Sequence, residues 1–283
     1  MVERSRKLDF LAHVILILGV VVIAFPLYVA IVASTHTAAE IVQSPMPMLP
    51  GPHLVQNYRE ALLGTGNGQG SNAPVARMMF VSLVMALTIA IGKIVISLLS
   101  AFAVVYFRFP FRMLCFWAIF VTLMLPVEVR VGPTYHVVAS LGMINTFAGL
   151  TIPLIASATA TFLFRQFFLT VPEELVEAAR MDGAGPMRFF MDILVPLSST
   201  SIAALFVIQF IYGWTQYLWP LIATTSDSMY PIVIGIRYMI AGGESQTHWN
   251  LVMATAMLAM IPPALVVILM QKWFVKGLVD TEK

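Results

Sequence analysis

Six apolar stretches, each long enough to cross a bilayer as a helix, constrain this chain more than any other feature. A helix needs roughly 20 apolar residues to span the hydrocarbon core. The stretches are Phe10–Ala33, Met78–Phe107, Met113–Ala139, Phe147–Phe164, Ile193–Ala223 and Leu251–Met270. Inside them, only Lys93, Glu128 and Arg130 are charged. The sequence therefore predicts an all-α, polytopic membrane protein with six transmembrane helices.

Composition supports a membrane protein and excludes several other classes. The chain is 59% hydrophobic and 11% charged, whereas soluble domains carry about 25% charged residues. A net charge of +2 gives no sign of nucleic-acid binding. The single cysteine, Cys115, excludes an intrachain disulfide and is interpreted as a packed residue. The first apolar stretch exceeds a signal-peptide core and lacks a small-residue cleavage site, so we interpret it as a true span.

The distribution of lysine and arginine predicts the orientation in the membrane. Between the spans, eleven of these residues lie on the side that holds both termini and three on the other. Cytoplasmic loops carry the excess of positive charge, so both termini are expected in the cytoplasm. The long outside loops are then residues 34–77, with a proline cluster and a glycine-rich stretch, and residues 224–250.

One cytoplasmic segment, residues 170–196, reads as helix although no bilayer is there to cover it. Pro172 and three glutamates favour a helix start. Two apolar stripes with helical spacing follow, on either side of Gly183: Leu175, Ala178 and Ala179, then Met187, Phe190 and Met191. These stripes pack either on a partner protein or on the ends of this chain's own helices, and spacing alone does not decide.

A motif in this segment resembles the EAA loop of ABC importer permeases. It reads Glu177-Ala178-Ala179-Arg180-Met181-Asp182-Gly183, then nine residues, then Ile193-Leu194-Val195-Pro196. The family pattern is E-A-A-x3-G-x9-I-x-L-P, and only Val195, usually leucine in the family, departs from it. The resemblance implies a coupling helix that docks in a cleft on a separate ATP-hydrolysing subunit. The residues it assigns to that contact are Glu177, Ala178, Ala179, Asp182 and Gly183.

Further segments resemble the carbohydrate-type branch of the same family. They are Phe25-Pro26-Leu27-Tyr28, the run from Gly213 to Pro220, and Phe274-Val275-x-Gly277. More narrowly, Thr122–Arg130, Ala156–Phe168 and the last seven residues resemble permease subunits of sn-glycerol-3-phosphate importers. This resemblance implies the type I importer fold over a single domain, residues 1–283.

The resemblance also implies an assembly. Its other members are a second homologous permease, two ATPase subunits and a periplasmic or lipid-anchored binding protein, with the 224–250 loop reaching toward that binding protein. The chain itself lacks a P-loop, because none of its five lysines precedes serine or threonine. We therefore expect no enzymatic activity, cofactor or metal site here, with ATP and Mg²⁺ bound by the partner ATPase.

Three charges inside the predicted bilayer indicate function or specific pairing, because a midplane charge costs roughly 2.5 to 3.5 kcal/mol. From the helix rise, Lys93 lies about 20 Å above the cytoplasmic face, Glu128 about 22 Å and Arg130 about 25 Å. Lys93 and Glu128 thus form a candidate ion pair, structural or functional. Arg130 has no evident internal partner, and Pro126 and Pro133 on either side predict a kinked or broken helix.

The outer end of the fifth span holds a second candidate group, Trp214, Gln216 and Tyr217. These residues line a polar cavity, or else the aromatic ones form an interfacial belt with Trp219. Together with Lys93, Glu128 and Arg130 they are the candidate substrate-pathway residues.

Two substrate classes remain open, and a third reading does not involve an ATPase. A phosphate ester, such as sn-glycerol-3-phosphate or a related phosphodiester, suits a fixed guanidinium at Arg130. A neutral sugar has no use for that charge. A secondary transporter coupled to ions through Lys93 and Glu128 would leave the EAA spacing without a purpose.

Overall fold

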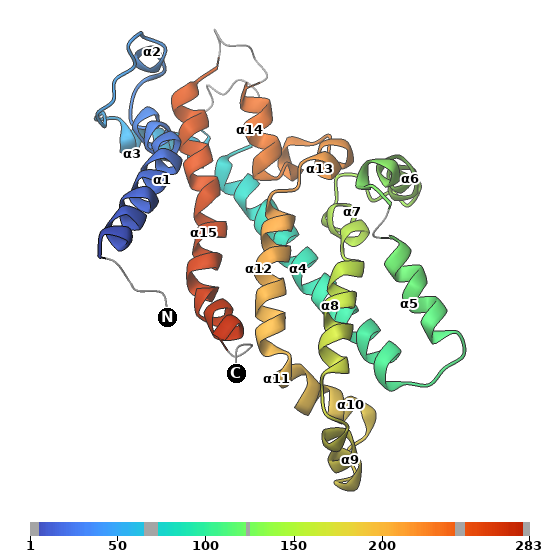
Figure 1. Ribbon diagram of the computed structural model, residues 1–283. Coiled ribbons are helices and arrows are strands. Elements are labelled where there is room, and N and C mark those ends of the chain that lie inside the picture. The colour runs from blue at the N-terminus through green and yellow to red at the C-terminus, as the bar shows by residue number, and fades with distance from the viewer. Residues whose placement is uncertain (1–5, 65–72, 123–124, 241–246, 280–283) are drawn as a thin grey trace. The chain divides into compact units, whose positions relative to one another are not determined.

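The computed structural model describes residues 6–64, 73–122, 125–240 and 247–279, and within them every regular element is a helix (Figure 1). For residues 6–9, 127–128 and 274–279 only the backbone is described. The longer α-helices are α1 (Arg6–Ala33), α3 (Leu54–Leu63), α4 (Val75–Tyr106), α5 (Arg112–Val121), α6 (Val127–Ser140), α8 (Ala158–Leu169), α9 (Glu173–Met181), α12 (Ser199–Trp214), α14 (Ile232–Ile240) and α15 (Trp249–Val279). The shorter helices are α2 (Ala38–Ile41), α7 (Phe147–Thr151), η2 (Ile152–Leu154), α10 (Pro186–Phe189), η3 (Phe190–Leu194), α11 (Val195–Leu197), α13 (Leu218–Ala223) and η4 (Asp227–Met229).

By packing, the chain divides into two compact units. The first comprises Met1–Ala76 and Gly235–Met260, and the second Arg77–Ile234 and Ile261–Lys283. That all 283 residues form one permease domain stays a prediction.

Among the described residues, three helices are long and apolar enough to cross a membrane: Phe10–Ala33, Val75–Tyr106 and Trp249–Trp273. Two more spans result if each bent pair counts as one. Phe147–Leu154 and Ala158–Leu169 bend by 48°, and Pro186–Leu197 and Ser199–Trp214 bend by 73°. The described helices thus supply three to five spans, where the sequence predicts six.

The predicted third span, Met113–Ala139, is not one continuous helix. It is divided between α5 and α6, and the break expected at Pro126 is present because that residue is the N-cap of α6. A proline has no N–H to donate within a helix, which favours a helix start at this position. Pro133, by contrast, is accommodated inside α6. Because of this break, Arg130 lies at the start of a new helix, α6.

An aromatic core holds the second unit together at the end that carries the predicted cytoplasmic segment. Phe102 of α4 contacts Phe190, with ring centroids 4.9 Å apart, and Phe164 and Phe168 of α8 are fully buried beside them. Ala179 of α9 belongs to the same cluster. The predicted cytoplasmic helices are therefore anchored on the membrane helices by apolar burial.

Close helix packing elsewhere in this unit depends on Gly213. A Cβ at this position would lie 2.8 Å from the Cα of Ala86, so α12 and α4 approach at backbone distance. We expect Gly213→Ala to destabilise the protein by about 1–3 kcal/mol, the usual effect of overpacking. Gly132→Ala is the control, because nothing lies within 4 Å of its Cβ position. Thermal unfolding in detergent tests the pair, and equal midpoints would contradict the close approach.

In the first unit, a buried polar network fixes the segment that follows α1. Asn57 of α3 donates to the carbonyl oxygens of Ser34 and His36, both at 2.8 Å. The ring of His36 lies between Glu40 Oε2, 3.2 Å away, and the carbonyl oxygen of Leu49, 2.8 Å away. Asn250 of α15 donates to Asn57 Oδ1 at 3.1 Å. The buried amide of Asn57 is thus paired at both its nitrogen and its oxygen, as buried polar groups generally are.

Glu40 in this network gives the first unit a pH dependence. The backbone N–H of Thr37 donates to Glu40 Oε2 at 2.9 Å. This hydrogen bond, together with hydrogen bonds to the side chains of Thr37 and His36, lowers the pKa of Glu40 below its usual value of 4.5. Folding therefore favours the carboxylate, and its stabilisation is present above that value and lost as pH falls through the folded pKa. We expect Glu40→Gln to lower the unfolding midpoint near neutral pH, and the difference to vanish in acid. A difference that persists in acid would contradict this.

Candidate functional site

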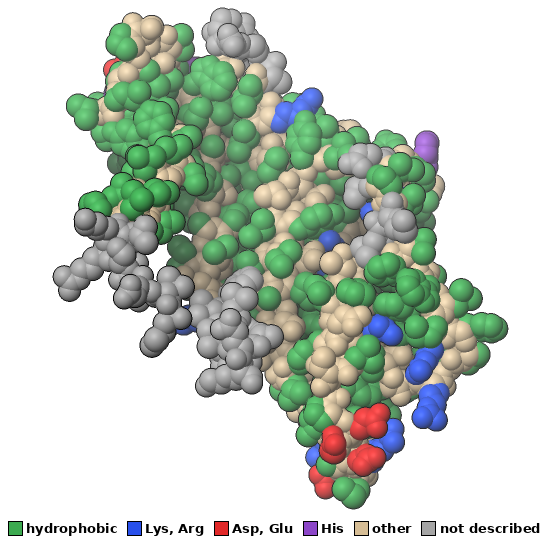
Figure 2. All heavy atoms as spheres, in the orientation of Figure 1, with side chains coloured by type: hydrophobic (Ala, Val, Ile, Leu, Met, Phe, Trp, Pro, Cys, Tyr) green, Lys and Arg blue, Asp and Glu red, His purple; other side chains and the backbone are tan. Residues whose placement is uncertain are grey.

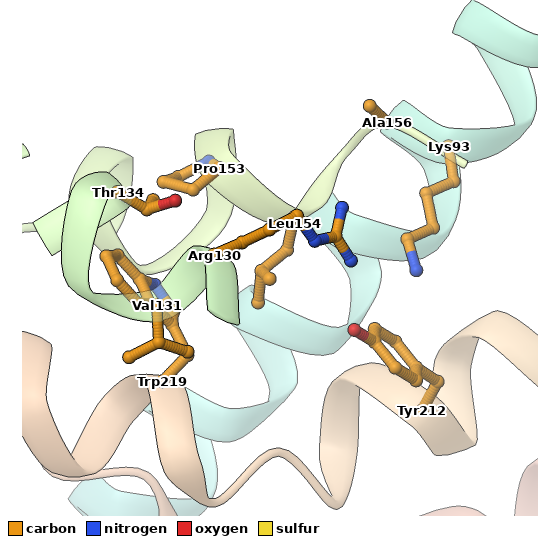
Figure 3. Close-up of a pocket in the computed structure, with 9 residues that line it drawn as sticks. All are labelled: Lys93, Arg130, Val131, Thr134, Pro153, Leu154, Ala156, Tyr212 and Trp219. Atoms are coloured by element: carbon orange, nitrogen blue, oxygen red, sulfur yellow. The ribbon is translucent and has the colours of Figure 1, made fainter. Parts of the chain in front are cut away.

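A pocket of about 90 Å³ in the second unit brings together the two described charges of the predicted bilayer (Figure 3). Lys93 comes from α4 and Arg130 from α6, although 37 positions separate them in sequence (130 − 93). The other lining residues are Val131, Thr134, Pro153, Leu154, Ala156, Tyr212 and Trp219. Five helical segments thus meet at one small cavity, and it carries positive charge.

Lys93 is buried, with 6% of its surface exposed, and has two partners on α12. Its Nζ donates to Gln209 Oε1 at 3.0 Å and lies 3.6 Å from the centroid of the Tyr212 ring. Sequence reasoning missed both residues. Their spacing of three places them on one face of α12, the only available signal. The ion pair expected with Glu128 stays a prediction, because that side chain lies outside the described residues.

Arg130 is exposed at the pocket, and its guanidinium extends toward the Lys93 ammonium (Figure 3). Among the described side chains it has no hydrogen-bond or ion-pair partner. An arginine keeps its charge at physiological pH and offers a planar fork of donors to a phosphate or carboxylate. The pocket can therefore receive an anion.

The remaining candidate pathway residues lie outside the lining of this pocket. Trp214 is 3% exposed and stacks on Phe210 with ring centroids 5.9 Å apart. Gln216 donates to the carbonyl oxygen of Tyr212 at 3.2 Å, and Tyr217 is 42% exposed. Trp219 is also buried, with 3% of its surface exposed, so it is not part of an exposed aromatic belt. Its indole N–H donates to the Gly149 carbonyl oxygen at 3.0 Å. A transport role for Trp214, Gln216 and Tyr217 stays a prediction.

The segment that resembles the EAA loop forms two short helices joined by a glycine turn. Helix α9 ends at Met181, and Gly183 follows with a φ of +72°. The Gly183 N–H donates to the Arg180 carbonyl oxygen at 3.0 Å, and the Ala184 N–H to that of Ala179 at 2.8 Å. This pair of bonds is a Schellman cap, which needs the left-handed conformation at that position. The glycine is thus required by this chain's own turn.

The apolar residues of these helices divide between the protein's core and its surface. Ala179 and Phe190 belong to the aromatic core, so part of the two stripes packs on this chain. Met181 is 83% exposed, and the side chains of Met187 and Met191 are also exposed. Acidic side chains gather over α9 (Figure 2). The helices thus present an apolar surface with an acidic margin, suited to a partner protein.

The second half of the motif coincides with an irregular turn. Residues Phe190–Leu194 form a π-helix, in which the Val195 N–H donates to the Phe190 carbonyl oxygen. Pro196 cannot donate to the carbonyl four residues earlier, which favours a local change of hydrogen bonding. The 73° bend before α12 follows directly. The motif's proline therefore marks the place where the surface helices turn into the membrane.

Comparison with known proteins decides the family. The family described as the binding-protein-dependent transport system inner membrane component matches residues 93–280. The chain belongs to this family. It is accordingly an all-α, multi-pass permease component of the inner membrane, and it works with a partner ATPase and a binding protein. The chemistry of ATP hydrolysis does not belong to this component.

Close relatives match the permease from end to end. The sn-glycerol-3-phosphate transport system permease proteins UgpE of Brucella melitensis and Agrobacterium fabrum are each 60% identical over 283 residues, covering both chains completely. UgpE of Yersinia enterocolitica is 58% identical over 284 residues, again with full coverage. A crystal structure of a bacterial ABC transporter involved in importing the acidic polysaccharide alginate aligns with a TM-score of 0.77, covering 97% of this chain and 99% of that chain. At 20% identity, it shows the shared fold alone.

Proposed function

We propose that this permease translocates sn-glycerol-3-phosphate, or a related glycerophosphodiester, across the cytoplasmic membrane. The observation that carries the proposal is identity of 57–60% over the full length to permeases named for that substrate. The pocket supports it independently. Arg130 and Lys93 face one cavity, and phosphate oxygens are natural acceptors for both donors. A neutral sugar would gain no charge pairing there.

The coupling segment, residues 170–196, is the proposed contact with the ATPase. Glu177, Ala178 and Asp182 are exposed on α9 and its cap, where an arginine or lysine of the partner can pair with the acids. Ala179 and Gly183 shape the helix end from within, through burial and the Schellman cap. The exposed methionines supply adaptable apolar contact.

The proposed assembly contains a second homologous permease, two ATPase subunits and a periplasmic or lipid-anchored binding protein. Helix α1 supports the second permease, because no residue in its most apolar 18-residue window is buried. Both termini lie in the cytoplasm in this arrangement, and the 224–250 loop approaches the binding protein. Residues 241–246 of that loop lie outside the described residues. No cofactor is assigned to this chain, and ATP with Mg²⁺ binds the ATPase.

Stimulation of ATP hydrolysis tests the substrate. The complete importer, reconstituted with its binding protein, is supplied in turn with sn-glycerol-3-phosphate, a glycerophosphodiester and neutral sugars. We expect the phosphate esters to stimulate hydrolysis and the sugars to leave it at the basal rate. Stimulation by a neutral sugar alone would reject the phosphate-ester assignment and favour the second candidate.

A further inference from the structure

A buried amide on α12 supports the transport pocket without lining it. Gln209 is 7% exposed, and its Oε1 accepts the Lys93 Nζ hydrogen bond at 3.0 Å. Tyr212, three residues later, places its ring 3.6 Å below the same nitrogen. Gln209 is not among the residues that line the pocket, so its link to the cavity is its contact with Lys93.

These two partners stabilise the charged ammonium of Lys93 at a position buried from water. Burial removes water from the ammonium, and the amide oxygen and the aromatic face replace part of that solvation. An ammonium has three hydrogens to donate, so the contact with Gln209 leaves others for the cavity. Figure 3 shows Lys93 and Arg130 directed into the same space. No carboxylate is among the described lining residues, so the two like charges favour a bound anion.

We propose that Gln209 and Tyr212 are positioning residues that hold Lys93 as a second cation beside Arg130, so that the pocket selects dianionic phosphate monoesters over monoanionic phosphodiesters. This inference rests on the proposed function. A phosphate monoester carries close to two negative charges above pH 7, because its second ionisation falls near pH 6. A diester carries one charge at any such pH. Two fixed cations neutralise both charges of the monoester, whereas one cation alone would leave one of its negative charges uncompensated in the pocket.

The test compares two probes in the complete importer, reconstituted in lipid vesicles with its binding protein. Import of sn-glycerol-3-phosphate and of glycerophosphoglycerol, a diester without a cationic group, is measured at pH 7.5 as kcat and KM. Gln209→Glu keeps the size and the acceptor but adds a negative charge beside Lys93. We expect it to lower the monoester-to-diester ratio of kcat/KM about tenfold, as for loss of one charge-assisted contact. Gln209→Leu should lower the ratio in the same direction.

Further variants separate positioning from a merely structural role. Tyr212→Leu is expected to lower the ratio, and Tyr212→Phe, which keeps the ring face, to recover it. Ile208→Leu is the matched control, because that neighbouring side chain is exposed on the same helix. Lowering the pH from 7.5 to 5.5 should reduce the wild-type ratio, since the monoester then becomes largely monoanionic, and leave the Gln209→Glu ratio nearly flat.

The outcomes distinguish this inference from the proposed function. If the wild type imports either ester and both Gln209 variants lose the two esters equally, or keep the wild-type ratio, the selectivity inference is overturned and the proposed function stands. If the wild type imports neither ester, both are overturned. A reduced ratio in the Gln209 variants, with Ile208→Leu unchanged, supports the inference.

Discussion

Import of a phosphorylated substrate is expected to fall about thirtyfold or more when Arg130 is replaced by glutamine, since losing one partner of a close charge pair costs 2–5 kcal/mol. The guanidinium extends into the pocket and has no described partner in the chain, so its removal should spare folding and the basal ATPase rate. Arg130→Lys should recover only part of the import, because it restores the charge without the bidentate geometry. Uptake into vesicles with matched levels of complex measures all three proteins.

Arg77→Gln is the control for Arg130. Arg77 is also an exposed arginine of the second unit, but it donates to the Ser228 carbonyl oxygen at 3.0 Å and does not line the pocket. We expect this variant to leave the preference for phosphate esters unchanged. Unaltered import in Arg130→Gln would remove Arg130 from the site. Equal loss of assembly and import would instead assign it to a contact with the sister permease.

Coupling to ATP hydrolysis is expected to fail when Gly183 is replaced by proline. The turn needs a φ of +72° and the Gly183 N–H bond to Arg180, whereas proline fixes φ near −65° and has no N–H. The protein should still insert, because its apolar helices are unchanged. Import should fall at least about tenfold and the ATPase should bind more weakly, because proline cannot form the Schellman turn and the C-terminal end of α9 loses its cap. Pull-down of the ATPase and uptake measure the two effects.

Two further substitutions show whether the backbone conformation is the cause. Gly183→Asn should retain most coupling, because asparagine tolerates the left-handed region. Gly185→Ala should also behave like the wild type, since Gly185 has a φ of −69° and nothing lies within 4 Å of its Cβ position. Normal import and ATPase binding in Gly183→Pro would reject this segment as the coupling element.

Sequence periodicity predicted the helical class, because a charge-free run of 20 residues has few alternatives in a membrane protein. It also predicted the break at Pro126, where the missing N–H acts locally. The division of Phe147–Phe164 and of Ile193–Ala223 into bent or separate helices was missed, because apolar content does not distinguish a straight helix from a bent one. The π-helix at Phe190–Leu194 likewise depends on packing around Pro196.

The candidate site was predicted as individual residues but not as a constellation. Lys93 and Arg130 were identifiable because a charge within an apolar run is costly. Their convergence depends on how α4 and α6 pack, which no spacing encodes. The contact between Gln209 and Lys93 could not be predicted from the sequence, because an uncharged amide in a membrane helix does not by itself indicate a partner. In the coupling segment, the split between buried Phe190 and exposed Met191 likewise needed the tertiary packing.

Direct uptake tests the central claim that this chain is the permease of an ATP-driven phosphate-ester importer. The complete complex is reconstituted in vesicles with its binding protein, and labelled sn-glycerol-3-phosphate is supplied with ATP, without ATP, or with a nonhydrolysable analogue on the ATPase side. We predict accumulation against a gradient only with ATP. Accumulation that is independent of ATP, or import of a neutral sugar with no import of the phosphate ester, would contradict the account.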